Sequence, residues 1–474
     1  MVELYGKDVL VVAQIVTNML RMFGFILLIP AFVAAIMKDY AYLELFFLMA
    51  IIIIVVFSII KRFLRQTECK MKHAVIALAI GWIIIPLIST IPFMINHMGF
   101  VDSFFESFSG WTGTGLTMIK EPSLIPNILN FYRGFIQWVG GFGIVVLALL
   151  FFEKPKTAQA LFLAEGRFED FYVDFSKIAR VIVLIYATYT FFGVLAFLLA
   201  GVPLLDAIVH TMSTIATGGY SSNSIGIGIY GKIPMLIAMV LMYIGGTSFL
   251  THYRVFKGNI KKLFNNPEVR FMFATTLVAG AIIAIDLFKA HKNNYYDGVF
   301  YAVSALTGTG AGTPVPISSF PSLSIFVFML LMLCGATYGS TSGAIKIWRI
   351  MIILKSIKRE IVKYFYPTGT ILQIKMGTHV ITDEDSLRAG AYVFLYLALL
   401  AVGSAIFVFA GYNMVSSFFL VSSAQGNVGL NIITENYFNM APFLKLLLTF
   451  HMFLGRLEII PFVVMLRSMV MIRR

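Results

Sequence analysis

Four short semi-polar segments interrupt the long apolar runs of this chain of 474 residues, and each has the pattern serine, five residues, glycine. They read SGWTGTG from Ser109, STIATGG from Ser213, SALTGTG from Ser304 and SAQGNVG from Ser423. Segments rich in glycine and hydroxyl groups leave backbone groups that hydrocarbon cannot satisfy, so they are tolerated at membrane depth only inside protein or beside water. Four such segments predict four walls around one aqueous path.

The composition is that of an integral membrane protein with many spans. Hydrophobic residues make up 59% of the chain and charged residues 12%, whereas about a quarter of the residues of a soluble domain carry charge. Runs of about twenty apolar residues, the length that crosses a bilayer, are predicted near 9–37, 41–60, 73–97, 130–152, 178–201, 233–251, 271–288, 321–334 with a continuation to 354, 389–411 and 441–466. The ten spans predict an all-α integral membrane fold.

Basic residues, which bring the net charge to +13, crowd alternate connections between the spans. The clusters lie in 61–72, 154–180, 254–270 and 349–388, and the last of these includes the longest polar stretch, predicted to be a cytoplasmic connection. By the positive-inside rule both termini are cytoplasmic and all four segments lie toward the outside. The charge therefore reflects topology and not nucleic-acid binding, and it can also meet anionic lipid or an acidic partner.

The four segments belong to a repeat of roughly a hundred residues that holds a span, a segment and a second span, as in transporters with parallel repeats about the membrane normal. The predicted boundaries are 1–63 for two extra N-terminal spans, then 64–160, 161–262, 263–365 with a broken second span, and 366–474. This organisation predicts four span, pore-loop, span units in pseudo-fourfold arrangement around one pore.

Two further marks recur in register with the last glycine of each segment. Thirteen residues before it stand Asp102, Asp206, Asp297 and, in the fourth copy, Ser416. The three acids are predicted to cap a short helix that enters from outside, and Glu106 could add negative charge to an outer vestibule. Twenty-five or twenty-six residues after that last glycine, within the following span, stand Gly140, Gly245, Gly335 and Gly455. Close helix packing is favoured over a hinge role for these four.

A short helix that points inward presents the negative end of its dipole to the membrane centre. A glycine-rich strand after it can turn backbone carbonyls toward an axis, because glycine adopts conformations that other residues avoid. Four such strands make a cation filter, in which carbonyl oxygens replace the hydration shell of the ion.

The residues of the segments and the later spans resemble the Trk/Ktr/HKT superfamily of potassium transporters. STIATGGYS and SGWTGTGLT look like the second and first filter loops of that family, and QWVGGFGIVVLAL resembles the span after the first filter. CGATYGSTSGAIKIWRI resembles the broken span with an intramembrane gating loop, and HMFLGRLEIIPF resembles the last span. The two extra N-terminal spans favour the Trk-type membrane subunit.

The resemblance implies a set of site residues. The ion-binding filter would consist of Thr114, Gly115, Gly218, Gly219, Thr309, Gly310, Val428 and Gly429, and the gate of Gly335, Gly339, Gly343, Lys346 and Arg456. Gly115 favours potassium, since the family associates serine there with sodium. Gly113 and Gly308 stand where the Trk type usually has threonine, and they could loosen the filter and weaken discrimination against sodium.

Three local alternatives stay open at the level of sequence. The stretch 335–343 is favoured as a gating loop over a mere kink, because a helix broken at membrane depth needs a polar lining. Lys346 is either an anchor that snorkels to the cytoplasmic end or a charge that lines the gate. Arg456 either faces the ion path or forms a structural salt bridge with Glu458, since a buried cation needs a partner or water.

The expected function is potassium uptake across the plasma membrane through a glycine-lined filter gated by the intramembrane loop. The alternatives are a sodium or weakly selective cation transporter and, from another class, a membrane-embedded enzyme. The resemblance also implies a homodimer and a cytoplasmic nucleotide-binding regulatory ring. No cofactor is expected in this chain, because no histidine spacing typical of a metal site and no phosphate-binding loop is found. Potassium is the transported ion.

Overall fold

The computed structural model describes residues 2–64, 70–143, 175–367, 370, 372–377, 379–433, 436–459, 462, 463, 465 and 467. The end of the span predicted at 130–152, from residue 144 on, and the predicted boundary between residues 160 and 161 lie outside the described residues. All the predicted filter and gate residues lie within them.

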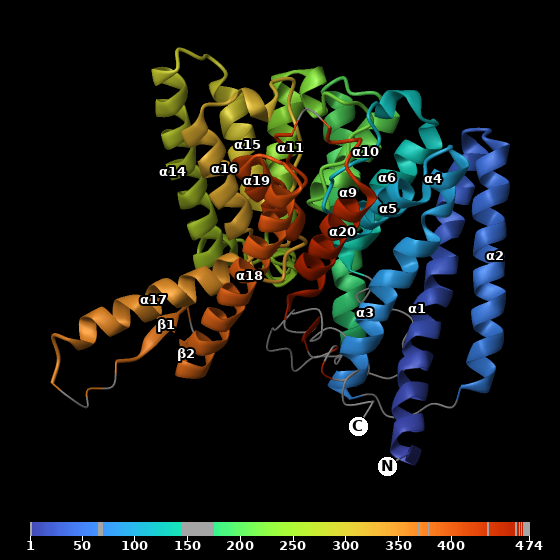
Figure 1. Cartoon of the computed structure of the whole chain (residues 1–474), viewed down its shortest axis with the longest axis horizontal. Helices are drawn as coiled ribbons and strands as arrows, with labels where there is room; N and C mark the ends of the chain where they lie inside the picture. The colour runs from blue at the N-terminus through green and yellow to red at the C-terminus, as the bar shows by residue number, and fades with distance from the viewer. Residues whose placement is uncertain are drawn as a thin grey trace.

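The first two helices form an antiparallel pair at one side of the molecule (Figure 1). α1 covers Val2–Ile36 and α2 covers Tyr40–Phe63. At about 1.5 Å per residue, the 24 residues of α2 are long enough to cross a bilayer. α1 packs on α2 and on later helices, whereas only 22% of the span in α2 is buried inside the protein. The pair corresponds to the two extra N-terminal spans predicted from sequence.

The rest of the chain repeats one arrangement four times: a first helix, a short helix, an extended segment and a last helix (Figure 1). The first helices are α3 (Met71–Ile88) with its continuation α4 (Ile91–Ile95), α9 (Phe175–Leu199), α14 (Pro267–Lys289) and α18 (Asp383–Phe409). The short helices are α5 (Phe100–Thr112), α10 (Leu204–Ile215), α15 (Tyr295–Thr307) and α19 (Met414–Gln425). The last helices begin with α6 (Asn127–Phe142), α11 (Lys232–Gly245), α16 (Ser322–Cys334) and α20 (Pro442–Leu457).

Within the described part of the chain, six helices are long and apolar enough to cross a membrane, or seven if the bent pair α11 and α12 (Phe249–Phe256) counts as one. Six of the ten predicted spans are these long helices. The other four predicted spans contain the last helices of the units, which are shorter or broken. The all-helical membrane architecture predicted from sequence is confirmed, and the continuity of the last spans is not.

Two last spans are broken in different ways. α12 turns by 99° from α11, and Ser248 starts it by accepting a hydrogen bond from the amide of Thr251 at 3.3 Å, as an N-cap does. The continuous span predicted over 233–251 is therefore wrong. In the third unit the predicted break is present: α16 ends at Cys334, and α17 (Ile347–Lys363) leaves the bundle sideways (Figure 1).

The acids predicted as N-caps of the short helices do not occupy that position. Asp102, Asp206 and Asp297 are each the third residue of their helix, and the N-cap residues are Gly99, Pro203 and Asn294. The helices begin earlier than predicted because these preceding residues already turn the chain into the helix. A first-turn carboxylate still favours the positive end of the helix dipole, and Asp102 also accepts a hydrogen bond from Lys445 Nζ at 2.5 Å.

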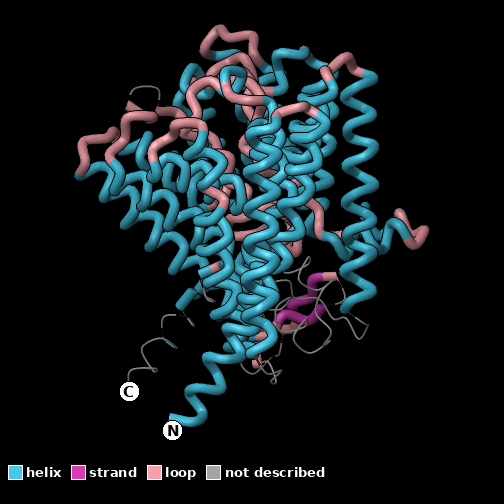
Figure 2. The backbone as a smooth tube through the Cα atoms, turned by 90° about the vertical axis from the view of Figure 1, so that its right-hand side faces the viewer, coloured by secondary structure: helices cyan, strands magenta, loops and turns pink. Residues whose placement is uncertain are grey.

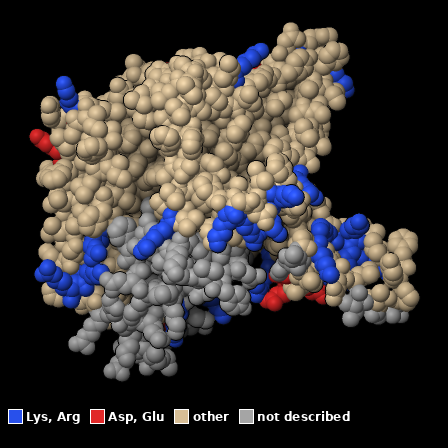
Figure 3. All heavy atoms as spheres, turned by 180° about the vertical axis from the view of Figure 1, so that it is seen from behind, with Lys and Arg blue, Asp and Glu red and all other residues tan. Residues whose placement is uncertain are grey.

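A short β-hairpin lies near the end of the molecule where α1 begins (Figure 2). β1 (Ile374–Met376) pairs antiparallel with β2 (His379–Ile381), and Ile374 faces Ile381. The predicted polar connection after α17 therefore contains this small sheet. The remaining short elements are η1 (Pro122–Leu124), η2 (Ile227–Tyr230), η3 (Ile317–Ser319) and α13 (Lys261–Phe264). Lysine and arginine side chains gather toward the same end (Figure 3), as the positive-inside pattern predicts for the cytoplasmic side.

Candidate functional site: a ring of four glycines

The eight residues predicted to form a filter meet around a common centre. A side chain added to each glycine would collide with a backbone carbonyl oxygen of the next segment: Gly115 with Gly218, Gly219 with Thr309, Gly310 with Val428, and Gly429 with Thr114. The order runs from the first segment to the second, third and fourth, and it returns to the first. The four extended segments therefore form a closed ring in which each glycine lies against a neighbouring carbonyl.

The backbone conformation of the ring requires glycine. All four residues have positive φ, with +84° at Gly115, +75° at Gly219, +69° at Gly310 and +99° at Gly429. Residues other than glycine rarely adopt these angles, and glycine adopts them at little steric cost. Conformation and close approach thus select the same residue at all four positions.

The position two residues earlier is also left-handed in every segment. Its occupants are Gly113 at +68°, Thr217 at +51°, Gly308 at +73° and Asn427 at +51°. Gly113 and Gly308 end α5 and α15 as left-handed C-caps, a common role of glycine. Gly113 and Gly308 match the left-handed conformation that the turn requires, so they lower backbone strain there. The sequence had suggested instead that they loosen the filter.

The last helices hold the short helices by close glycine packing in three units. A side chain on Gly140 would collide with the carbonyl of Trp111, one on Gly245 with that of Ile215, and one on Gly455 with that of Gln425. Each carbonyl belongs to the residue four positions before the ring glycine. The predicted packing role is confirmed for these three. Gly335 differs, because it ends α16 with φ +70°.

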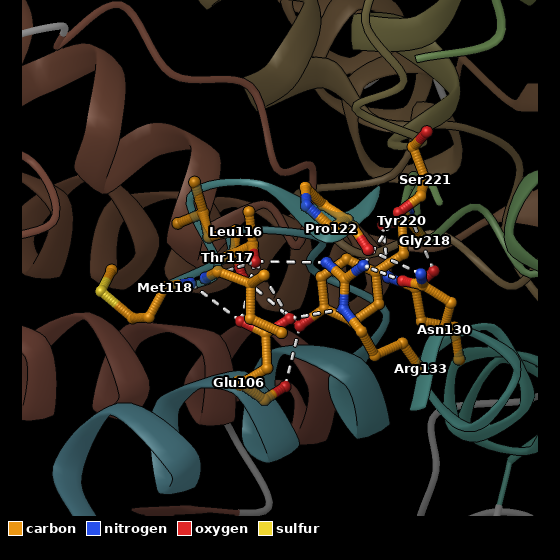
Figure 4. Close-up of polar contacts among 12 residues, drawn as sticks. Glu106, Leu116, Thr117, Met118, Pro122, Asn130, Arg133, Gly218, Tyr220 and Ser221 are labelled. Atoms are coloured by element: carbon orange, nitrogen blue, oxygen red, sulfur yellow. Dashed lines mark hydrogen bonds and ion pairs between the residues drawn. The ribbon is translucent and has the colours of Figure 1, made fainter. Parts of the chain in front are cut away.

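A buried ion pair lies behind the first two segments (Figure 4). Arg133 Nε donates to Glu106 Oε1 at 2.8 Å, and the two side chains are 2% and 0% exposed. The Glu106 carboxylate also accepts from the amide of Met118 at 2.8 Å and from the hydroxyl of Thr117 at 2.9 Å. The prediction that Glu106 adds charge to an outer vestibule is wrong, because its carboxylate is buried and paired.

Arg133 was missed in the sequence, although it had the same signal that drew notice to Arg456. It is a single cation in an apolar run, and such a cation needs a partner. The partner, Glu106, lies 27 residues away on the short helix. Nothing in the sequence spacing distinguishes it from the other acids of the chain.

The second segment rests on Gln137 and Tyr220 (Figure 4). Gln137 Nε2 donates to the carbonyl of Gly218 at 2.6 Å, and its Oε1 accepts from the amide of Tyr220 at 3.1 Å. The Tyr220 hydroxyl donates to the carbonyl of Glu106 at 2.8 Å, and the guanidinium of Arg133 lies 4.3 Å from the centre of the Tyr220 ring. A polar network therefore joins the first and second segments. Gln137 was not singled out from the sequence either.

The third and fourth segments are supported by neutral groups. The Tyr301 hydroxyl accepts from the amide of Thr313 at 3.2 Å and donates to the carbonyl of Val315 at 2.8 Å. In the fourth segment, Asn427 Nδ2 donates to Thr114 Oγ1 at 2.9 Å, which ties the last segment to the first. A hydrogen bond therefore joins the fourth segment to the first, in addition to the close approach of Gly429 to the carbonyl of Thr114.

The stretch 335–346 lies directly against the inner ends of three segments. The Thr341 hydroxyl lies 2.9 Å from that of Thr217 in the second segment. A side chain on Gly343 would stand 2.6 Å from Asn427 Oδ1 in the fourth segment, and one on Gly308 would stand 3.1 Å from Ser342 Cβ. Of the predicted gate residues, Gly343 therefore lies beside Asn427, and Thr217, Gly308 and Asn427 each directly precede a predicted filter residue in the sequence.

The same stretch is tied to the bend of the second unit. The amide of Thr337 donates to the carbonyl of Gly246 at 3.1 Å, and the amide of Phe249 donates to the carbonyl of Gly339 at 3.3 Å. The amide of Tyr338 donates to Glu268 Oε2, at the start of α14, at 2.7 Å. These bonds satisfy backbone groups that a broken helix leaves open at membrane depth.

Arg456 and Lys346 both reach this stretch. Arg456 Nη1 donates to the carbonyl of Thr341 at 2.7 Å, while Glu458 pairs with Arg349 at 2.5 Å. Lys346 is 6% exposed, and its ammonium donates to the carbonyl of Ser342. The contact of Arg456 agrees with a place beside the gate, and the burial of Lys346 is against a snorkelling anchor.

Comparisons with known proteins agree with this architecture. Residues 44–471 match the model of a family described as TrkH, cation transport protein. The chain is 31% identical to an uncharacterised cation transporter of Methanocaldococcus jannaschii, over 98% of this chain and 97% of that protein. It is 27% identical to the Trk system potassium uptake protein TrkH of Salmonella typhimurium, over 96% and 97% of the two chains. The crystal structure of the potassium transporter TrkH from Vibrio parahaemolyticus superposes with a TM-score of 0.86, at 26% identity, over 96% of this chain and 98% of that one.

Proposed function

We propose that this chain, which belongs to the TrkH family of cation transport proteins, takes up potassium through the ring of four glycines. The family consists of transporters, so the alternative of a membrane-embedded enzyme is set aside. Relatives named as Trk system potassium uptake proteins support potassium as the transported ion, including one from Escherichia coli that is 30% identical over 84% of this chain.

The single observation that carries this proposal is the closed ring of glycine and carbonyl contacts. A dehydrated cation needs several oxygen ligands to replace its water shell, and backbone carbonyls arranged around an axis supply them. The carbonyls of Thr114, Gly218, Thr309 and Val428 each lie against a glycine of the adjacent segment. In this proposal they line the ion path, and glycine is required because any side chain would displace them.

The charge distribution gives the orientation of the chain in the membrane, and the membrane potential then gives the direction of flux. The basic end of the molecule (Figure 3) corresponds to the cytoplasmic side of a plasma membrane protein by the positive-inside rule. Both termini are then cytoplasmic and the ring opens toward the outside. A negative interior draws cations inward with about 2.3 kcal/mol per charge per 100 mV.

The stretch 335–346 is proposed as the gate. Its contacts with Thr217, Asn427 and Arg456 lie on the inner side of the ring, where a movement of the stretch would open or close the path. Because α17 follows it directly and leaves the bundle, a force on α17 would reach the gate. Association as a homodimer and with a cytoplasmic nucleotide-binding ring remains part of this proposal, and the basic end is its docking surface.

Ion flux into liposomes that contain the purified chain tests the proposal. Potassium, rubidium, sodium and lithium gradients are compared under a clamped potential, with empty liposomes as the control. Flux of potassium and rubidium well above that of sodium and lithium supports the filter. Equal flux of all four ions would make the chain a weakly selective cation transporter. The absence of flux even after addition of the regulatory ring would contradict the proposal.

A further inference from the structure

We propose that the buried pair Glu106–Arg133 sets the spacing of the first two filter segments and thereby determines the ion selectivity of the pathway. The inference rests on the filter proposed above. Glu106 belongs to the short helix α5 and Arg133 to the last helix α6, and their side chains meet behind the ring (Figure 4). Both act as positioning residues.

Each residue of the pair binds one of the two filter segments. Glu106 accepts from the amide of Met118, three residues after Gly115. Arg133 Nη1 donates to the carbonyl of Ser221, two residues after Gly219, at 2.8 Å. The guanidinium is a rigid planar fork, so the atoms that bind Glu106 and Ser221 cannot move independently. A shift of one segment is therefore transmitted to the other.

The contact between the two segments lies next to this bridge. A side chain on Gly115 would collide with the carbonyl of Gly218, the same carbonyl that Gln137 holds from behind at 2.6 Å. Tyr220 adds a direct link, because its hydroxyl donates to the carbonyl of Glu106 at 2.8 Å. Networks of this kind in a low-dielectric interior stabilise a single geometry when every member is satisfied.

Neither carboxylate oxygen is available as an ion ligand. Glu106 Oε1 accepts from Arg133 at 2.8 Å and from Thr117 at 3.0 Å. Its Oε2 accepts from the amide of Met118 at 2.8 Å and lies 2.9 Å from the same Thr117 hydroxyl, whose single proton the two oxygens share. The residue therefore acts on the ion only through the segments it positions.

A charged pair is not needed to build such a unit. At the positions that match Glu106 and Arg133, the fourth unit has Leu420 and Leu448, and both are fully buried. An apolar pair of similar volume often equals or exceeds a buried ion pair in stability. Stability alone therefore does not explain the charged pair in the first unit. We attribute it to the position of the second segment, which Arg133 fixes through its hydrogen bond to the carbonyl of Ser221.

Three variants test the inference in the liposome assay. Arg133→Lys keeps the charge and loses the fork, and Glu106→Leu with Arg133→Leu copies the pair of the fourth unit. Both are expected to lower the ratio of potassium to sodium flux about tenfold, the scale of one charge-assisted hydrogen bond. Tyr220→Phe removes one hydroxyl bond and keeps the ring, and it is expected to lower the ratio about threefold by the same reasoning.

The matched control is Glu121→Gln. Glu121 is an exposed carboxylate of the same loop that accepts from Ser123 and Ser224, and its variant is expected to keep the wild-type ratio. Melting temperature and total flux are measured for each protein, because a merely structural role would lower both ions equally and leave the ratio unchanged, which would overturn the inference.

The outcomes separate the two proposals. A wild-type protein that passes sodium as well as potassium overturns the filter and the role of the pair together. A selective wild type with an unchanged ratio in Arg133→Lys and Tyr220→Phe overturns the role of the pair alone. If Arg133→Lys does not fold, the double variant Glu106→Leu with Arg133→Leu decides the question, because it removes the pair without leaving a buried charge unpaired.

Discussion

The first and third units each hold the extended segment after the short helix by a side chain of that helix, but the side chain is charged in the first unit and neutral in the third. Nine residues before the ring glycine, the first unit has Glu106 and the third has Tyr301. Each side chain accepts a hydrogen bond from the amide three residues after that glycine, at 2.8 Å from Met118 and at 3.2 Å from Thr313. The same backbone group is thus held by a carboxylate in one unit and by a neutral hydroxyl in the other.

The last helices of the two units also differ, because one packs on its short helix through a glycine and the other is broken at the matching position. α6 packs Gly140 against the short helix of its own unit, whereas α16 ends at Cys334, is capped by Gly335, and is followed by the stretch that lies against the ring segments. The first unit is therefore held by an ion pair and a packed helix, and the third by a hydroxyl and a broken helix. The comparison teaches that one repeat can close with a packed helix while its copy leaves a broken one, and the broken one is the stretch proposed as the gate.

The largest expected effect is on the ion pair itself. Arg133→Met leaves the Glu106 carboxylate buried without its partner, and breaking a buried pair costs about 3–5 kcal/mol. Thermal unfolding in detergent measures the loss. The matched change in the third unit, Phe328→Met, keeps an apolar side chain and is expected to cost less than about 1.5 kcal/mol. Equal losses would remove the proposed difference between the units.

Substitution of the ring glycine is expected to impair transport in both units. Gly310→Ala places a side chain on the carbonyl of Val428 at a φ of +69°, and a loss of potassium flux of about a hundredfold is expected, or about 2.7 kcal/mol. Gly115→Ser should also reduce the preference for potassium. Gly312→Ala is the control, because its side chain would approach only Tyr301 Oη at 3.9 Å. Normal flux and selectivity in Gly310→Ala would exclude this glycine from the filter.

The broken helix predicts a movable gate in the third unit. Arg456→Gln removes the guanidinium that donates to the carbonyl of Thr341, and it is expected to raise the flux about tenfold, since about 1.4 kcal/mol of restraint is lost. Deletion of residues 335–343 should raise flux in the same direction. Arg388→Gln, on the exposed surface of α18, serves as the control in the same liposome assay. Flux that stays at the wild-type level in both variants would contradict a gate.

The smallest expected effect is the loss of the neutral support. Tyr301→Phe removes the hydroxyl that holds the amide of Thr313, and it is expected to cost about 1 kcal/mol of stability. Tyr295→Phe, at the more exposed start of the same helix, should change nothing measurable. If Tyr301→Phe costs as much as Arg133→Met, the hydroxyl and the ion pair are equivalent supports.

Much of the ring could be predicted from sequence because its requirements are local. Positive φ and close backbone approach both demand glycine, so Gly115, Gly219, Gly310 and Gly429 mark the ring by residue type and spacing alone. The break after Cys334 was also visible, because small polar residues fill a stretch that otherwise belongs to a span.

The supports behind the ring could not be predicted in the same way. Arg133 needs a partner in the interior, but several acids lie in the chain, and only the packing of α5 on α6 brings Glu106 to it. The bend between α11 and α12 was not predicted, although residues 245–248 read GGTS, the same glycine and hydroxyl composition that marks the break after Cys334. The stretch is only four residues long and stands inside an otherwise apolar run, so its signal is weaker. The helices begin three residues before the predicted caps, because Gly99, Pro203 and Asn294 occupy the N-cap positions.

The sequence by itself therefore determined the membrane fold, the four units, the ring glycines and the broken third span, because each depends on residue types at short spacing. Only the tertiary structure decided which carbonyl faces which glycine, that Arg133 joins two segments through Glu106 and Ser221, and that Arg456 reaches Thr341. The physical reason is that a low-dielectric interior requires a partner for every buried polar group, while the identity of the partner depends on how distant helices pack.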